Sequence, residues 1–557
     1  MSKIKHAEGK ERKFLTVAVE ILQGMLEQEG ILDNAVQNAD INSIHKLFKK
    51  ASNDSGITYK EDKQEPLGHI TITTYNENNE KTPAQVKFFR IYDNEKHCDS
   101  ERLHDDVNSY DYESFTGKIN MERFITGLDG TLEADILCGR YLVEISKGSE
   151  YGIIKDYIEV GYGITNKEYY LKSFIDLSKY GWYAGDIHHH SIYSSPVYKG
   201  DDDVTESPME VANSMMAMGL RYGALSDHHN ILCHEKWRET KNKDFLPIVS
   251  KEISTSNGHV IALGAKNDVI FRIPDEKDRS DEYMRSEFIR ITDEIKQLGG
   301  LAQLNHPCDL SKSISWNPEY IDIIDIFETI EIWNGSVPMI KGSTNYKAYE
   351  LWLSLLKQGI YIPATTGSDT HNIKADDYND YYELIQKLYK VISAPKYPKL
   401  KKEIHVEKLI FKKAKAILEK WAKMCLTSGC VRTYVHVEDE ITEVNIMNGL
   451  RQGKSFLTNG PILIYNPCNG EAMNEDYKGN LLLMSARPLQ YLRIYSPKGL
   501  YREIKLDSNK ALLKRDNCEF YDYSFSLKDD KLLKLDWYYF VAADDCTNMA
   551  ITNPYFN

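Results

Sequence analysis

The chain has 557 residues, too many for one hydrophobic core, and we expect about three or four domains. Hydrophobic residues make up 42% and charged residues 27%, as is typical of soluble globular proteins, and no apolar stretch is long enough to cross a bilayer. The formal net charge of −14 argues against non-specific binding of nucleic acid, which requires a basic surface. The charged first residues lack the apolar core of a secretory signal, so we expect a cytoplasmic protein that does not associate with membranes.

The first two regions differ in the spacing of their apolar residues. In residues 1–61 these residues recur at helical spacing, as Leu15, Val19, Leu22 and Leu26. In residues 62–178 they alternate with polar residues between polar turns, as in Ile70-Thr71-Ile72. We therefore expect a helical segment followed by a small antiparallel β-sandwich.

From Trp182 the pattern changes to short apolar runs that alternate with amphipathic helices, two of them near 283–298 and 346–358. This alternation predicts a parallel sheet, open or closed into a barrel, over residues 179–460. A tyrosine-rich and lysine-rich stretch over about 373–430 interrupts the alternation and is interpreted as a helical insertion. Short alternating runs return over 461–557 and predict a second β-sandwich. We expect a chain that begins near Trp182 to fold alone, provided that the first sandwich packs only at its edge.

Histidines and carboxylates follow the predicted strands of the middle region. They are His188, His189 and His190, then Asp227 and His228, then Glu252 with His259 a short turn later, then His306, and finally Asp369 and His371. Because the carboxyl ends of parallel strands meet at one rim, five strands would bring these side chains to one place.

Imidazole and carboxylate ligands suit zinc, manganese or iron. In an extended His-x-His run alternate side chains share a face, so His188 and His190 can bind one ion while His189 points away. A carboxylate such as Glu252 can bridge two ions. Each motif alone is more often incidental than functional, but five strand ends of this kind together predict a metal centre.

These motifs resemble the PHP superfamily, named for polymerase and histidinol phosphatase, and most closely its CehA/McbA-type metallohydrolases. The resemblance runs from about Gly181 to the C-terminus and includes Gly185–His190, Ser226–His228, Glu252, Gly258-His259, Asn305–Pro307 and Gly367–His371, with further matches at Glu331–Gly335, Arg432–Val435, Leu450–Lys454, Thr458–Pro461 and Ile551–Pro554.

The resemblance implies a distorted seven-stranded (β/α) barrel, flanked here by the two β-sandwiches, that holds two or three divalent ions. The implied ligands are His188, His190, His228, Glu252, His259, His306, Asp369 and His371, with Glu252 as the bridge. Asp227 would orient a ligating imidazole. The family's further acidic-loop ligand has no direct counterpart, because Ser194-Ser195-Pro196 replaces its usual turn; Asp203 is nominated by its spacing to Pro208, with Asp201 and Asp202 as alternatives.

The expected activity is hydrolysis of a small molecule by a metal-bound hydroxide, with Glu252, Asp369 and His228 as the residues that take part in catalysis. Asp369 would also move a proton toward the leaving group. An amide, carbamate or ester substrate follows from the CehA/McbA resemblance, and a small phosphate ester or nucleotide is the alternative from elsewhere in the superfamily. A non-catalytic metal-binding module is ranked last, because nearly all the ligands are present. The sequence does not predict an oligomeric state.

Overall fold

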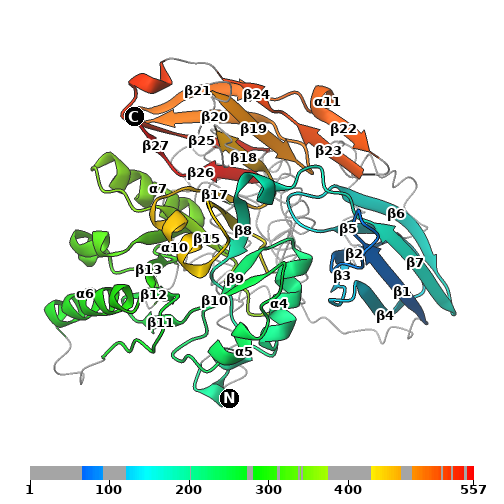
Figure 1. Cartoon of the computed structure of the whole chain (residues 1–557), viewed down its shortest axis with the longest axis horizontal. Coiled ribbons are helices and arrows are strands. Elements are labelled where there is room, and N and C mark those ends of the chain that lie inside the picture. Colours follow the sequence, from blue (N-terminus) through cyan, green and yellow to red (C-terminus); the bar gives the residue numbers. More distant parts are fainter. Residues whose placement is uncertain are drawn as a thin grey trace, which may run out of the picture.

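The computed structural model describes residues 66–91, 121–200, 202, 204–272, 280–309, 314–335, 339, 343–373, 428–465, 479–515, 518–527, 531–544 and 548–557. The predicted N-terminal helical segment and nearly all of the predicted insertion lie outside these residues. The described part is mostly β-structure with few helices, and its strands form four sheets (Figure 1).

The N-terminal strands belong to two sheets that share one apolar core. One sheet has the order β4-β1-β7, from Thr131–Leu137, Leu67–Tyr75 and Ile164–Tyr170. The other contains β6-β5-β2-β3, from Ile153–Val160, Gly139–Ser146, Gln85–Ile91 and Met121–Ile125. Alternating apolar residues of both sheets, such as Ile72 and Val143, are fully buried between them, as their period of two requires.

The middle strands fall into two sheets. In one, β8 (Trp182–Asp186), β9 (Tyr222–Leu225) and β10 (Leu246–Val249) are parallel neighbours. The other has the order β11-β12-β13-β14-β15, from Glu252–Thr255, Gly258–Leu263, Leu301–Asn305, Thr329–Asn334 and Ala364–Gly367. Here β11, β12 and β13 are antiparallel, and only β13, β14 and β15 are parallel.

A closed (β/α) barrel is therefore not supported, because no continuous ladder of hydrogen bonds among the described strands closes the two sheets into a ring. Isolated parallel bridges join the sheets at two points, His189 with Thr370 and His228 with Glu252. Both bridges lie at the carboxyl ends of β8 and β9, where the predicted ligands are.

Helices pack against the middle strands. The main ones are α4 (Pro208–Ala217), α5 (His234–Arg238), α6 (Asp281–Gln297), α7 (Thr344–Lys357) and α10 (Glu443–Arg451). Short 3-10 helices occur at Leu177–Tyr180, Ile192–Ser194, Pro196–Tyr198, Pro318–Ile326 and Leu532–Lys534. A capping box starts α4, where Ser207 and Glu210 bond each other's backbone N–H. None of the helices in the described ranges is both long enough and apolar enough to span a bilayer.

The C-terminal strands extend sheets that begin elsewhere in the chain. β16 (Arg432–His436) pairs with β8 and with β17 (Ser455–Thr458), and β17 pairs with β26 (Met549–Thr552). That sheet continues through β25, β20 and β21, from Trp537–Ala543, Tyr491–Ser496 and Gly499–Lys505. The remaining elements are β18 (Ile462–Tyr465), β19 (Asn480–Ser485), α11 (Ser508–Ala511), β22 (Leu512–Arg515), β23 (Cys518–Asp522), β24 (Phe525–Ser526) and β27 (Tyr555–Phe556).

The N-terminal sheets contact the rest of the molecule through more than an edge. β23 pairs with β6, so one nine-stranded sheet contains both N-terminal and C-terminal strands. The partly buried Lys147 donates through its ammonium to the carbonyl oxygens of Pro83 and Met216, at 2.7 and 3.0 Å. We expected a chain that starts near Trp182 to fold alone only if the first sandwich packs at its edge. These contacts show that this condition is not met.

Candidate metal centre

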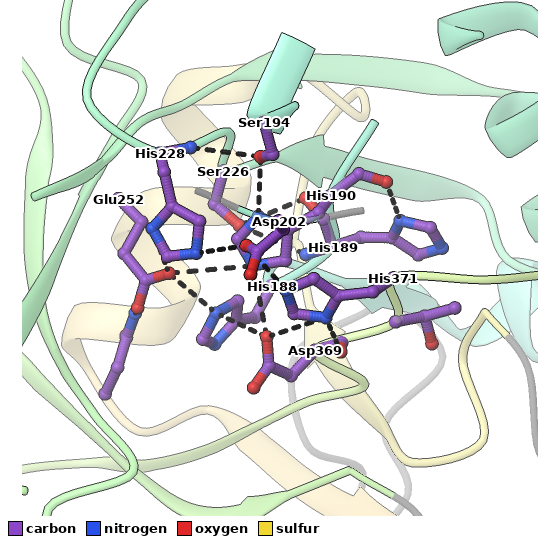
Figure 2. A network of polar contacts seen from close by, with 12 residues as sticks. His188, His189, His190, Ser194, Asp202, Ser226, His228, Glu252, Asp369 and His371 are labelled. Atoms are coloured by element: carbon purple, nitrogen blue, oxygen red, sulfur yellow. Dashed lines mark hydrogen bonds and ion pairs between the residues drawn. The ribbon is translucent and has the colours of Figure 1, made fainter. Parts of the chain in front are cut away.

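After β8 the chain stays extended and presents its histidines to two sides. His188 and His190 point toward the other predicted ligands, whereas His189 points away from them (Figure 2). His189 Nδ1 lies 2.8 Å from the His190 carbonyl oxygen, and its Nε2 lies 2.8 Å from Ser428 Oγ. The alternation predicted from the extended His-x-His run is thus observed.

A buried carboxylate holds this segment in place. Asp186 Oδ1 accepts hydrogen bonds from the backbone N–H groups of His188 and Ser368, at 3.3 and 3.0 Å, and Oδ2 accepts one from Gly429 at 2.8 Å. Burial raises the pKa of Asp186, and these backbone donors oppose that rise. Asp186 therefore ties three separate segments together beneath the site.

Glu252, at the start of β11, lies at the middle of the site and is 1% exposed. Its Oε1 lies 3.1 Å from His259 Nδ1 and 3.2 Å from His306 Nε2, and it accepts a hydrogen bond of 2.8 Å from Asn305. The sheet sets this arrangement, because His259 on β12 and Asn305 on β13 are register partners.

The second oxygen of Glu252 faces a different group of histidines. Oε2 lies 3.4 Å from His188 Nε2, 3.6 Å from His190 Nε2 and 3.4 Å from His228 Nδ1. One carboxylate thus contacts two histidine groups, each through its own oxygen.

A third group lies beside His190. Asp202 Oδ2 is 2.8 Å from His228 Nε2 and 3.0 Å from His371 Nε2. The nominated acidic-loop residue, Asp203, lies outside the described residues, as does Asp201. Asp202, the described member of the acidic run, contacts both imidazoles.

Asp369 follows β15 and has a positive φ of 50°, a region that non-glycine residues rarely adopt. Its Oδ1 lies 3.1 Å from His190 Nε2 and 3.3 Å from His188 Nε2. Its Oδ2 lies 3.3 Å from Asn334 Nδ2, which can donate to it. His306 also has a positive φ, of 24°. Strained backbone at two predicted ligands is typical of functional sites.

The sequence reasoning missed the role of Glu331. This fully buried carboxylate of β14 lies with its Oε1 3.0 Å from His188 Nδ1, and its Oε2 accepts hydrogen bonds from the His306 N–H and Asn334 Nδ2. The signal was present, because Glu331 is an acidic residue inside the apolar run Thr329–Asn334. A buried glutamate in a strand requires such partners.

Asp227 is linked to the predicted ligands through serine side chains. Its Oδ1 accepts from the Ser191 N–H and from Ser194 Oγ, and its Oδ2 accepts from Ser191 Oγ. Ser194 Oγ in turn lies 3.0 Å from His190 Nδ1. Asp227 therefore orients His190 through a serine rather than by direct contact with an imidazole.

The carboxylates and imidazoles of the metal centre shift one another's pKa values. Burial alone would raise the pKa of Glu252 and Asp369, but the surrounding imidazoles hold both well below the usual range. Burial alone would lower the pKa of His188, but the carboxylates of Glu331, Asp369 and Glu252 raise it well above the usual value. Burial, together with His371 and His228, lowers the pKa of His190 to about 3. The site thus contains ionised carboxylates and at least one neutral imidazole, the forms that bind metal ions.

The donor set fits divalent metal ions. Four groups bring their ligand atoms within 4.8 Å of one another: His190, Asp202, His228 and His371; His188, His190 and Glu252; His188, His306 and Glu331; and Glu252, His259 and His306. Within the described ranges, His188 Nε2 and His306 Nδ1 are buried and form no hydrogen bond. Because an unpaired buried polar atom is costly, these nitrogens indicate a missing partner. Buried histidine and carboxylate groups that could hold metal ions are therefore present.

Comparisons with known proteins assign no family. No protein-family model and no curated protein matches the chain. An amidohydrolase from Chromobacterium violaceum is a weak structural neighbour, with 17% identity over 34% of this chain and 87% of its own, at a TM-score of 0.22. The Bacillus anthracis TIE protein matches 26% of this chain and 20% of its own, at 14% identity and a TM-score of 0.13. Neither likeness is strong enough to support an argument about this chain.

Proposed function

We propose that this chain is a metal-dependent hydrolase of the PHP superfamily, of the CehA/McbA type, that cleaves an amide, carbamate or ester bond of a small molecule. The observation that supports this most is the position of Glu252, whose two oxygens face different histidine groups in a buried site. A carboxylate placed in this way can bridge two cations.

The residues divide into the groups that would hold each ion. His188, His190, Asp369 and Glu252 would hold the first, and Glu252, His259 and His306 the second. A third ion would lie between Asp202, His228 and His371. Glu331 would keep His188 in a fixed orientation through Nδ1, which leaves Nε2 as the ligand atom.

Bound divalent ions would supply a Lewis acid and lower the pKa of water, which provides a nucleophile near neutral pH. The protein's own residues have separate roles beside this nucleophile. Glu252 is nearly inaccessible and would hold charge in place, whereas the Asp369 side chain is 22% exposed and can reach a substrate. Asp369 Oδ1 faces the histidines and would bind the ion, whereas Oδ2, which accepts a hydrogen bond from Asn334, is the oxygen left to receive or deliver a proton.

Two measurements test this function. Elemental analysis of protein purified without chelator should find at least two zinc, manganese or iron ions per chain. A panel of amides, carbamates, carboxylic esters and phosphate monoesters should then show metal-dependent turnover, lost on chelation and restored by added metal. Turnover of phosphate esters alone would replace the proposed substrate class by the phosphoesterase alternative. A folded, metal-free protein that takes up none of these ions would contradict the proposal.

A further inference from the structure

A polar cavity outside the metal centre lies where three parts of the chain meet. Its walls come from the N-terminal strands β2 and β5, from Met218 at the end of α4, from Arg432 at the start of β16, and from the segment after β19. The cavity volume is about 60 Å³. A water molecule needs roughly 10–15 Å³ on the same measure, so the cavity accommodates a ligand of a few non-hydrogen atoms. None of its lining residues is a candidate metal ligand.

The ionisable side chains that line this cavity are mostly basic, although the chain as a whole is acidic. Lys87, Arg432 and Arg487 line it, together with a single carboxylate, Glu144. Glu144 is the register partner of Lys87, and its Oε2 lies 3.4 Å from Arg487 Nη2. Lys87, Glu144 and Arg432 are each less than 5% exposed. Charges buried to this degree are costly unless they are paired.

Arg432 is the cation with no carboxylate partner in the described part of the chain. Its two terminal nitrogens donate to the carbonyl oxygens of Met218 and Gly429, at 2.6 and 2.7 Å. Its Nε is buried and has no hydrogen-bond partner there. Gly148 fits closely beside it, since an added Cβ would lie 2.7 Å from Arg432 Nη1. The guanidinium is therefore held rigidly with its charge unbalanced, and arginine does not lose its proton in proteins.

We propose that this cavity binds a small oxyanion, either inorganic phosphate or the carboxylate of a short organic acid. An oxyanion would balance the charge of Arg432 and accept hydrogen bonds from Arg432 and Arg487. The hydroxyl of Ser485 and the amide of Asn548, which also line the cavity, can donate to the same ligand. The proposal does not depend on the metal centre.

Isothermal titration calorimetry of the full-length protein with phosphate, and separately with acetate, tests this site at ionic strength matched with chloride. Each titration is repeated after chelation, which removes binding to metal ions. One of the two anions should bind in both states. Arg487→Met should weaken that binding roughly tenfold or more, as the loss of a charge-assisted hydrogen bond implies, and Arg487→Lys should restore part of it. Arg493→Met changes an arginine of β20 that does not line the cavity; it is the matched control and should leave anion binding unchanged.

Ala486→Glu provides a second variant that removes no existing side-chain contact. Ala486 lines the same cavity, and a carboxylate there should abolish anion binding by repulsion. Binding of neither anion by the wild-type protein overturns the proposal. Binding that disappears on chelation, or that survives both Arg487→Met and Ala486→Glu, also overturns it, because the anion then lies elsewhere.

Discussion

Replacing Glu252 by glutamine keeps the size of the side chain and removes the charge that faces two histidine groups. We expect Glu252→Gln to lose at least one bound ion and to lower turnover by orders of magnitude, since nucleophile and Lewis acid each contribute several kcal/mol. The fold should persist, because the amide can still accept the hydrogen bond from Asn305. Metal stoichiometry and turnover of the purified variant check this.

The matched control for that variant is Glu287→Gln, which changes a glutamate of similar burial on α6 that bonds Arg290 instead of the histidines. It should lose some stability but keep its metal content. Normal metal content and near-normal turnover in Glu252→Gln would disprove the bridging role.

The acidic loop supports a second prediction. Asp202→Asn removes the carboxylate that lies between His228 and His371, so the ion of that group should be lost or bound more weakly while the ions nearer Glu252 remain. Asp203→Asn, the comparison variant, should keep full metal content. Elemental analysis of both decides between them. If Asp203→Asn loses the ion and Asp202→Asn does not, the assignment is reversed.

Single residues differ in how well the sequence predicts them. Histidines after apolar runs are conspicuous, because neither a core nor an ordinary turn requires several of them. Glu331 was missed because it interrupts an apolar strand at one position only, and only the fold shows that His188 and His306 surround it. Spacing nominated Asp203 with Asp201 and Asp202 as alternatives, and this choice stays a prediction, because Asp203 and Asp201 lie outside the described residues.

Among the elements, apolar runs predicted the existence of strands better than their direction. The short apolar runs predicted over residues 179–460 became β8, β9, β10, β12, β13, β14 and β15, and we expected them to lie in a parallel sheet. The antiparallel pairing of β11 with β12 follows instead from a two-residue turn, Ser256-Asn257, before Gly258 with a φ of 139°. Asn257-Gly258, at the end of this turn, is a residue pair typical of hairpins. This hairpin brings His259 back to Glu252.

The link between β5 and β6 supports a prediction about pH. Glu150 accepts hydrogen bonds from the Leu177 N–H at 2.8 Å and from the Tyr434 hydroxyl at 3.1 Å. Burial raises its pKa to about 7, from 4.5. Between these values the folded state binds more protons than the unfolded state, so the free energy of unfolding falls as the pH rises through this window. Ionising Glu150 in the folded state costs roughly 3 kcal/mol, at 1.36 kcal/mol per pKa unit, and this full cost applies above pH 7.

Glu150→Gln resembles the protonated side chain at every pH. We expect this variant to match the wild-type protein near pH 5 and to have a higher melting temperature near pH 8. Glu159→Gln, at an exposed position of β6, is the control and should change neither value. A Glu150→Gln protein that is no more stable than wild type at pH 8 would show that Glu150 is ionised at little cost.

At the scale of the whole molecule, the sequence predicted separate regions that follow one another along the chain. In the structure, strands from different regions belong to the same sheets. Pairings between strands that are far apart along the chain, such as β23 with β6 and β17 with β26, produce no local pattern. The C-terminal strands consequently extend both the N-terminal and the middle sheets (Figure 1). Composition and period identify the strands, but not the sheet to which each belongs.

Deleting residues 1–178 should therefore leave a chain, 179–557, that is insoluble or unfolds without cooperativity. The deletion exposes the edge of β23, a site for aggregation, and removes the contacts of Lys147 and Glu150 with α4 and β16. Size-exclusion chromatography and thermal melts of this chain measure the effect. Co-expression of residues 1–178 as a separate chain is the control, because it should restore a soluble complex if the lost contacts are the cause. A monodisperse chain of residues 179–557 with a cooperative melt would show instead that the middle and C-terminal strands form an independent folding unit.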